Sequence, residues 1–207
     1  MTERPGLAQN IDARIRKIQR IYLEGHRPLV AGTLARLRRA VATEPGSDPW
    51  VWHEAVEGLP TELAGQGDAA SPGERAAYAA MTLYAVHQQS KSMPMHQTGP
   101  SLGRAVRRLG TPEGAEGASA AVKRRFDALM TSTTFNELQH HSRGLIQQLR
   151  AADIALDYGR FAEDLRLLQN PVAANSVRLR WGRDYAFGGT RDTPDPQNSD
   201  SREGTAS

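Results

Sequence analysis

The sequence contains no cysteine among its 207 residues. This excludes disulfide bonds, thiolate metal ligands and cysteine nucleophiles. It also has no run of about 18 consecutive apolar residues, the length that a membrane-spanning helix requires. No hydrophobic signal core follows the polar N-terminus. We therefore expect a soluble protein. The absence of cysteine is compatible with a reducing compartment, so we expect the protein in the cytoplasm.

Aromatic residues are also scarce, at 6% of the chain. Alanine and leucine, which are strong helix formers, far outnumber the β-branched and aromatic residues that fit a pleated sheet. The composition therefore predicts an all-α protein. The length allows either one large domain or two small ones.

The usual catalytic motifs are missing as well. The sequence has no Asp-x-Asp, no His-x-x-x-His, no glycine-rich phosphate loop and no Gly-x-Ser-x-Gly elbow. His140 and His141 are adjacent on a predicted helix, where their side chains point about 100° apart, so the pair alone cannot chelate one ion. Glu163 and Asp164 lie close to basic residues and are expected to form surface ion pairs. We predict no catalytic residue, no metal site and no cofactor.

Apolar residues recur three and four positions apart through most of the chain, which is typical of helices with one buried face. Asp48 before Pro49 looks like a helix N-cap, and the helix that follows is expected to bury Trp50 or Trp52. The sequence Ser-Pro-Gly-Glu at residues 71–74 has the form of a capping box. The predicted helices are residues 7–24, 28–43, 49–57, 72–89, 101–109, 118–130, 135–152, 157–168 and 172–185.

Residues 110–117 contain Pro112 and three glycines and are the best candidate for a domain boundary. We therefore predict two small helical-bundle domains joined by a short linker. The first is an N-terminal helical domain, residues 1–112, and the second is a C-terminal four-helix bundle, residues 113–187. Residues 188–207 cannot bury apolar surface and are predicted to be a disordered tail.

The formal net charge is +3, and all but three of the 26 basic residues are arginine. The tail has two more acids than bases, so the rest of the chain carries about +5. The planar guanidinium group suits bidentate contact with phosphate. A GC-rich genome would produce the same preference for arginine, so only the clustering of these residues can indicate a function.

Basic residues gather at four places with helical spacing. One interpretation is a groove that follows a phosphodiester backbone, without base readout because no reading motif is present. The alternative is solvated helix faces that nearby acids partly neutralise. The four groups are Arg104, Arg107 and Arg108; Lys123, Arg124 and Arg125; Arg143 and Arg150; and Arg36 and Arg39.

Three stretches of the sequence resemble the CasB family, the small subunit of the type I-E CRISPR Cascade surveillance complex. The first is LYAVHQQSK at 83–91, followed by Pro94-Met95-His96 and by SLGRAVRRL at 101–109. The second is VKRRFDAL at 122–129 with LQHHSRGLI at 138–146, and the third is LDY at 156–158 running to VRLRWGRDY at 177–185. In order and spacing they cover most of residues 7–187.

The resemblance implies a non-catalytic, two-domain helical subunit that functions in antiviral defence. Its expected partners are the backbone and large subunits of Cascade, a second copy of itself, crRNA with its target DNA, and single-stranded DNA, with no membrane. The family stabilises the crRNA–target heteroduplex and guides the displaced strand of the R-loop through basic surface residues. The matching positions are Arg38, Arg39, Lys91, Arg104, Lys123, Arg124, Arg125 and Arg143, and we add Arg107 and Arg108 on helical geometry.

The sequence is also compatible with two other hypotheses. The chain could be an assembly scaffold whose arginines bind acidic groups of proteins and touch nucleic acid only incidentally. An RNA-processing enzyme could use His87 or His96 as a general acid or base, although partner groups are missing nearby. Arg178, Arg180 and Arg183 also match the family motif, but their closeness to Trp181 suits a role in the fold or in a subunit contact equally well.

Overall fold

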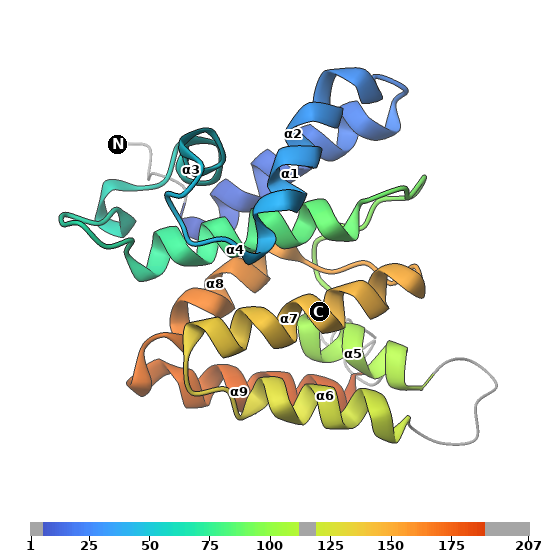
Figure 1. Ribbon diagram of the computed structural model, residues 1–207. Helices are drawn as coiled ribbons and strands as arrows, with labels where there is room; N and C mark the ends of the chain where they lie inside the picture. The colour runs from blue at the N-terminus through green and yellow to red at the C-terminus, as the bar shows by residue number, and fades with distance from the viewer. Residues whose placement is uncertain (1–5, 112–118, 189–207) are drawn as a thin grey trace, which may run out of the picture.

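The computed structural model describes residues 6–111 and 119–188, and regular structure in these residues is helical (Figure 1). One isolated β-bridge, between His96 and Leu156, is also present there. The predicted all-α class is confirmed, whereas the predicted tail beyond Gly188 and most of the predicted linker lie outside the described residues. The α-helices are α1 (Leu7–Leu23), α2 (Arg27–Arg39), α3 (Pro49–Val56), α4 (Pro72–His87), α5 (Leu102–Gly110), α6 (Ala120–Met130), α7 (Phe135–Ala151), α8 (Tyr158–Leu168) and α9 (Pro171–Phe187), with short 3-10 helices η1 (Ala40–Ala42) and η2 (Thr61–Leu63).

Side-chain caps fix where several helices begin. The carboxylate of Asp48 accepts hydrogen bonds from the first backbone N–H groups of α3, and Ser71 with Glu74 forms a reciprocal capping box at α4. Both caps agree with the prediction. A second capping box, Thr134 with Glu137, starts α7.

The expectation that Trp50 or Trp52 is buried was wrong, because both indoles are only half-buried. The helix buries the smaller Val51 and Ala55 fully, while both indoles pack against the edge of the core. One face of Trp50 is covered by the guanidinium of Arg36, 4.7 Å from the ring centroid. A helix of two turns contains too few apolar residues for their spacing to predict which face is buried.

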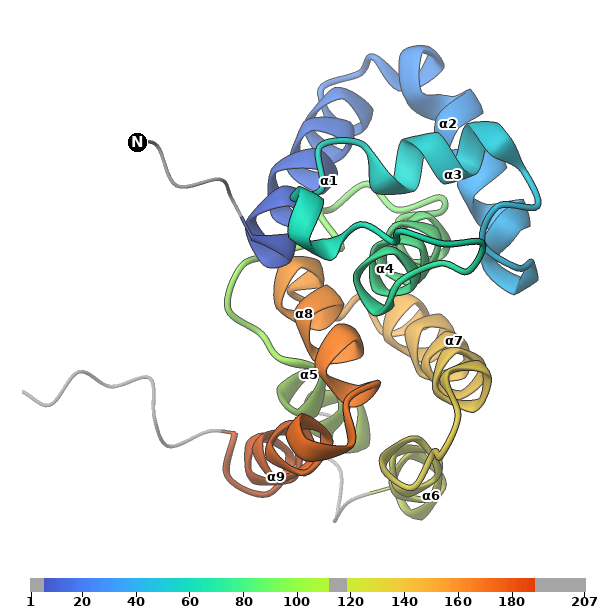
Figure 2. The same ribbon diagram turned by 90° about the vertical axis from the view of Figure 1, so that its left-hand side faces the viewer.

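Helix α4 is the centre of the fold. Every residue from Ala76 to His87 is buried, as expected for a helix without a polar face. It packs against α1, α2, α3, α7 and α8, and these neighbours surround it in the end-on view of Figure 2.

Helices α5 and α9 form a second layer with α6 and α7 below α4 (Figures 1 and 2). Gly103 in α5 lies against the backbone carbonyl of Trp181 in α9, where a Cβ atom would clash. Glycine therefore permits the close approach of these two helices.

One hydrophobic cluster runs through both halves of the chain. Helix α8 packs on α1 and α4, and α5 packs on α9, although α5 was predicted for the N-terminal domain. The division at residue 112 stays a prediction. No described helix is both long enough and apolar enough to cross a membrane.

Candidate nucleic-acid interface

The predicted basic residues of α5 and α6 lie at one corner of the protein. The end of α5, the first turns of α6 and the last turn of α9 meet around Tyr185, whose ring stacks on Phe126 with centroids 5.0 Å apart. Gly110 lies close to both Val122 and Tyr185. The fold therefore brings together two groups that are separated in the sequence.

The three arginines of α5 differ in their surroundings. Arg107 donates hydrogen bonds to the backbone carbonyls of Tyr185 and Ala186, at 2.8 and 2.7 Å, and so caps the C-terminus of α9. Arg104 is half-buried beside Gly188, whereas Arg108 is exposed. Of the three, Arg108 is the one whose surroundings best suit phosphate contact.

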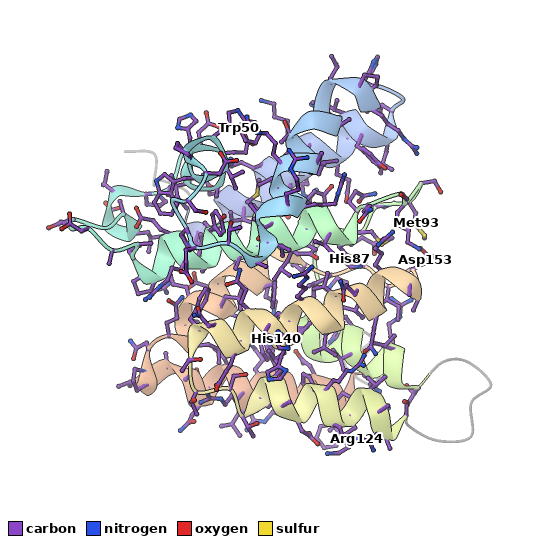
Figure 3. The ribbon with its side chains drawn as sticks, in the orientation of Figure 1. Trp50, His87, Met93, Arg124, His140 and Asp153 are labelled. Carbon is purple, nitrogen blue, oxygen red and sulfur yellow. The ribbon has the colours of Figure 1, made fainter. Side chains whose placement is uncertain are left out.

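The basic residues at the start of α6 are all exposed. Lys123 forms an ion pair with Asp127 one turn later, with a nitrogen–oxygen distance of 2.6 Å. No residue in the described part of the chain pairs with Arg124 or Arg125. Figure 3 labels Arg124 on the outer side of α6, away from α7. These two guanidinium groups are therefore open to an anionic partner.

A second basic group forms where α7 passes the end of α2. The amide of Gln139 donates to the carbonyl of Val41, at 3.1 Å, and holds the two segments together. Arg143 and His140 line a hollow of about 230 Å³ together with residues 41–44, which include one acid, Glu44. Arg38 and Arg39 lie in the last turn of α2, directly before this segment. Helices α2, α7 and α6 follow one another along one side of the protein in Figure 2.

Lys91 lies apart from both groups. Its ammonium pairs with Asp153 at 2.6 Å, and its side chain is 20% exposed. The pair links the end of α4 to the turn after α7, near the tip where Figure 3 labels Met93 and Asp153. This contact gives Lys91 a structural role whether or not it also binds nucleic acid.

The arginines near Trp181 are mostly engaged within the protein. Arg180 pairs with the buried carboxylate of Asp164, which also accepts a hydrogen bond from the Trp181 indole at 2.6 Å. Burial raises the pKa of Asp164, and these hydrogen bonds oppose the rise. Arg178 donates to the carbonyl of Ser132 at 3.0 Å. Arg180 therefore stabilises the fold.

The two histidines considered as catalytic groups are both buried. Nδ1 of His87 lies 3.0 Å from the hydroxyl of Tyr158, and burial lowers the pKa of His87 to about 3. Nδ1 of His96 accepts a hydrogen bond from the backbone N–H of Tyr158 at 3.2 Å, so its Nε2 donates to Asp12 at 2.9 Å. Neither imidazole is placed to reach a substrate.

Asp12, His96 and Asp157 offer ligand atoms that lie within 4.8 Å of one another. Each of these groups already has protein partners: Asp12 pairs with Arg16 at 2.8 Å, and Asp157 caps α8 and accepts the N–H of Gly99 at 2.8 Å. Together with the His96 bonds they join α1, the loop before α5 and α8. We interpret this cluster as a structural hydrogen-bond network that connects these three segments.

Comparison with known proteins places the chain beside CRISPR-associated proteins. The sequence model of the family described as CRISPR-associated protein Cse2 matches residues 33–185. The crystal structure of CasB from Thermobifida fusca has a TM-score of 0.70 and 32% sequence identity, and the match covers 86% of this chain and 97% of that one. A Cse2-family protein from Thermus thermophilus shares the fold, with a TM-score of 0.61 at 22% identity over 88% and 99% of the two chains. No curated protein matches the sequence significantly.

Proposed function

The chain belongs to the CRISPR-associated Cse2 family, and from this we propose that it is the non-catalytic small subunit of a type I-E Cascade complex. In such a complex the guide RNA reads the target by base pairing, so a subunit that lies along the heteroduplex needs to contact only the backbone. The role that we propose for this chain is to stabilise the crRNA–target heteroduplex and the displaced strand of the R-loop.

The observation that carries the proposal is the row of arginines along α2, α7 and α6. Arg39, Arg124 and Arg125 are exposed, and Arg143 lines an open hollow. The helices that carry them, α2, α7 and α6, follow one another in Figure 2. No described acid pairs with these four side chains. Contacts with phosphates release counterions whatever the base sequence is, so such a row suits a strand whose sequence is read elsewhere.

The mechanism follows from the competition between two states of the target DNA. The displaced strand can either re-anneal with its complement or stay apart. A basic surface that neutralises its phosphates favours the separated state, and it does so with little sequence preference. The full set of residues proposed for this contact is Arg38, Arg39, Lys91, Arg104, Arg107, Arg108, Lys123, Arg124, Arg125 and Arg143, of which Lys91 and Arg107 are the most constrained by contacts within the protein.

The proposal is tested by fluorescence anisotropy with single-stranded DNA over a series of salt concentrations. We compare the full chain with the double variant Arg124→Ala/Arg125→Ala. The matched control is Lys17→Ala/Arg20→Ala, which removes two exposed charges from α1. Each lost phosphate contact lowers the slope of log affinity against log salt by about 0.7, so the α6 variant should lose about 1.4. The control should keep nearly the whole slope, and equal losses in both variants would contradict the proposed surface.

One observation favours contact with other proteins as well. Leu179 and Phe187 on α9 are 58% and 65% exposed, and they border a groove of about 580 Å³ together with Met130 and Arg183. Exposed apolar surface of this kind suits subunit contact. If the chain were only an assembly scaffold, Arg124→Ala/Arg125→Ala would reduce incorporation into the complex and leave the affinity for DNA unchanged.

A further inference from the structure

A cavity of about 460 Å³ opens where α7 and α9 begin and α8 ends. This end of the protein faces the viewer in Figure 2. Its polar lining comes from Arg75 of α4, Arg178 of α9, the hydroxyl residues Ser132, Thr133 and Thr134, and Gln169. The loop that carries the hydroxyl groups joins α6 to α7, the helices of the basic row.

The lining carries positive charge without an acid. Arg75 lies over the ring of Phe135, 5.7 Å from its centroid, and Arg178 gives one N–H to the carbonyl of Ser132. Neither arginine has a carboxylate partner among the described residues. The nearby carboxylate of Glu137 is taken up by the backbone N–H groups of Thr133 and Thr134, at 2.8 and 3.2 Å. The cavity therefore favours an anion.

Two buried atoms of the lining residues lack a hydrogen-bond partner within the described chain: Nε of Arg75, which is a donor, and Oε1 of Gln169, which is an acceptor. The orientation of the Gln169 amide is fixed, because its nitrogen donates to the carbonyls of Pro72 at 2.9 Å and Leu165 at 3.1 Å. Buried polar atoms in native proteins nearly always have partners. Both atoms have almost no exposed surface, so a ligand reaches them only after a small shift of the side chains that cover them; to satisfy both atoms it must carry an acceptor and a donor.

We propose that this cavity binds a phosphate-bearing ligand of nucleotide size. The phosphate accepts hydrogen bonds from Arg75 and Arg178, and a sugar hydroxyl or a base amino group donates to Gln169. Phe135 and Leu168 supply an apolar wall for the rest of the ligand. The volume lies in the range of small-molecule sites and is larger than a phosphate ion needs. If the phosphate belongs to a bound strand, this site rests on the proposed function and adds a further contact with that strand.

The test is a ¹H–¹⁵N NMR titration of the full chain with adenosine 5′-monophosphate. Adenosine, inorganic phosphate and a short single-stranded DNA with a 5′-phosphate are titrated separately. We expect saturable shifts of the backbone amides of Thr133, Thr134 and Ala174 with the monophosphate, and weaker effects with adenosine or phosphate alone. Shifts at these amides with the DNA as well would assign the source to a strand, whereas shifts with the mononucleotide alone would assign it to a free nucleotide.

Arg75→Gln removes the positive charge and shortens the side chain, but keeps a polar group near Phe135. It should weaken monophosphate binding about tenfold or more, the usual effect of losing a hydrogen bond to a charged group. Arg20→Gln, an exposed arginine on α1 outside both proposed sites, should leave this binding unchanged. The titration of the unaltered chain does not depend on how well Arg75→Gln folds. Absence of saturable shifts at these amides overturns the site.

The site and the proposed function can fail separately. If single-stranded DNA binds with a salt slope that depends on Arg124 and Arg125, but neither the monophosphate nor the DNA shifts the cavity amides, the basic row is supported and the cavity site is ruled out. If the monophosphate binds in the cavity but the chain does not bind DNA, the cavity site is supported and the proposed function is ruled out.

Discussion

Protonation of the buried histidine His87 should destabilise the fold in mild acid. Its ring lies in the middle of the protein between α4 and α8, against the hydroxyl of Tyr158 (Figure 3). Burial is the largest cause of its lowered pKa, and the backbone carbonyl of Ile154 opposes this only in part. The folded chain therefore keeps the ring neutral down to a pH of about 3.

The size of the effect follows from the difference between the two states. In the unfolded chain the same ring titrates near the ordinary histidine pKa of about 6.5. The stability that depends on the neutral ring is fully present above that pH, and it is lost as the pH falls from there toward the folded-state pKa. Between about pH 7 and pH 5 the loss should be roughly 2 kcal/mol, because one pKa unit corresponds to about 1.4 kcal/mol.

The assay is urea denaturation followed by circular dichroism at both pH values. His87→Gln removes the titrating group, so its free energy of unfolding should fall by about 2 kcal/mol less than that of the unaltered chain over this interval. His140→Gln is the matched control, because that ring is exposed on α7, and it should retain the full pH dependence. An unchanged pH dependence in His87→Gln would refute the assignment.

Two further substitutions test the packing. Asp164→Ala removes the buried partner of Arg180 and of the Trp181 indole, and it should cost about 3 kcal/mol in unfolding free energy measured with urea; a cost below about 1 kcal/mol would show that the pair matters little. Gly103→Ala places a methyl group against the Trp181 carbonyl and should cost about 1–3 kcal/mol. Gly144→Ala in α7, where a Cβ meets open space, should instead be neutral or stabilising by up to about 1 kcal/mol, so equal destabilisation by both would contradict the close approach of α5 and α9.

Local sequence signals predicted the helices well. The caps at Asp48 and Ser71 depend on hydrogen bonds within four residues, and such bonds can be recognised from the sequence alone. The wrong expectation for Trp50 and Trp52 concerns packing, which is decided by distant residues such as Arg36.

The sequence was less informative about which arginines are available. Helical spacing placed Arg104, Arg107 and Arg108 on one face, but it could not show that the end of α9 would supply carbonyl partners for Arg107. Nothing in the sequence indicated a binding role for Arg75, since it is a single basic residue in the first turn of an apolar helix. Its neighbours in the cavity, such as Ser132 and Arg178, come from segments much later in the chain.

The most direct test of the central claim measures the lifetime of the R-loop in a reconstituted type I-E complex. The complex is assembled with the unaltered chain, with Arg124→Ala/Arg125→Ala, or without this subunit, and incorporation of the variant is checked by gel filtration. We expect the R-loop to collapse faster without the subunit, and also with the variant even though the variant is fully incorporated. An R-loop of unchanged lifetime in the fully incorporated variant and in the complex lacking the subunit would contradict the account.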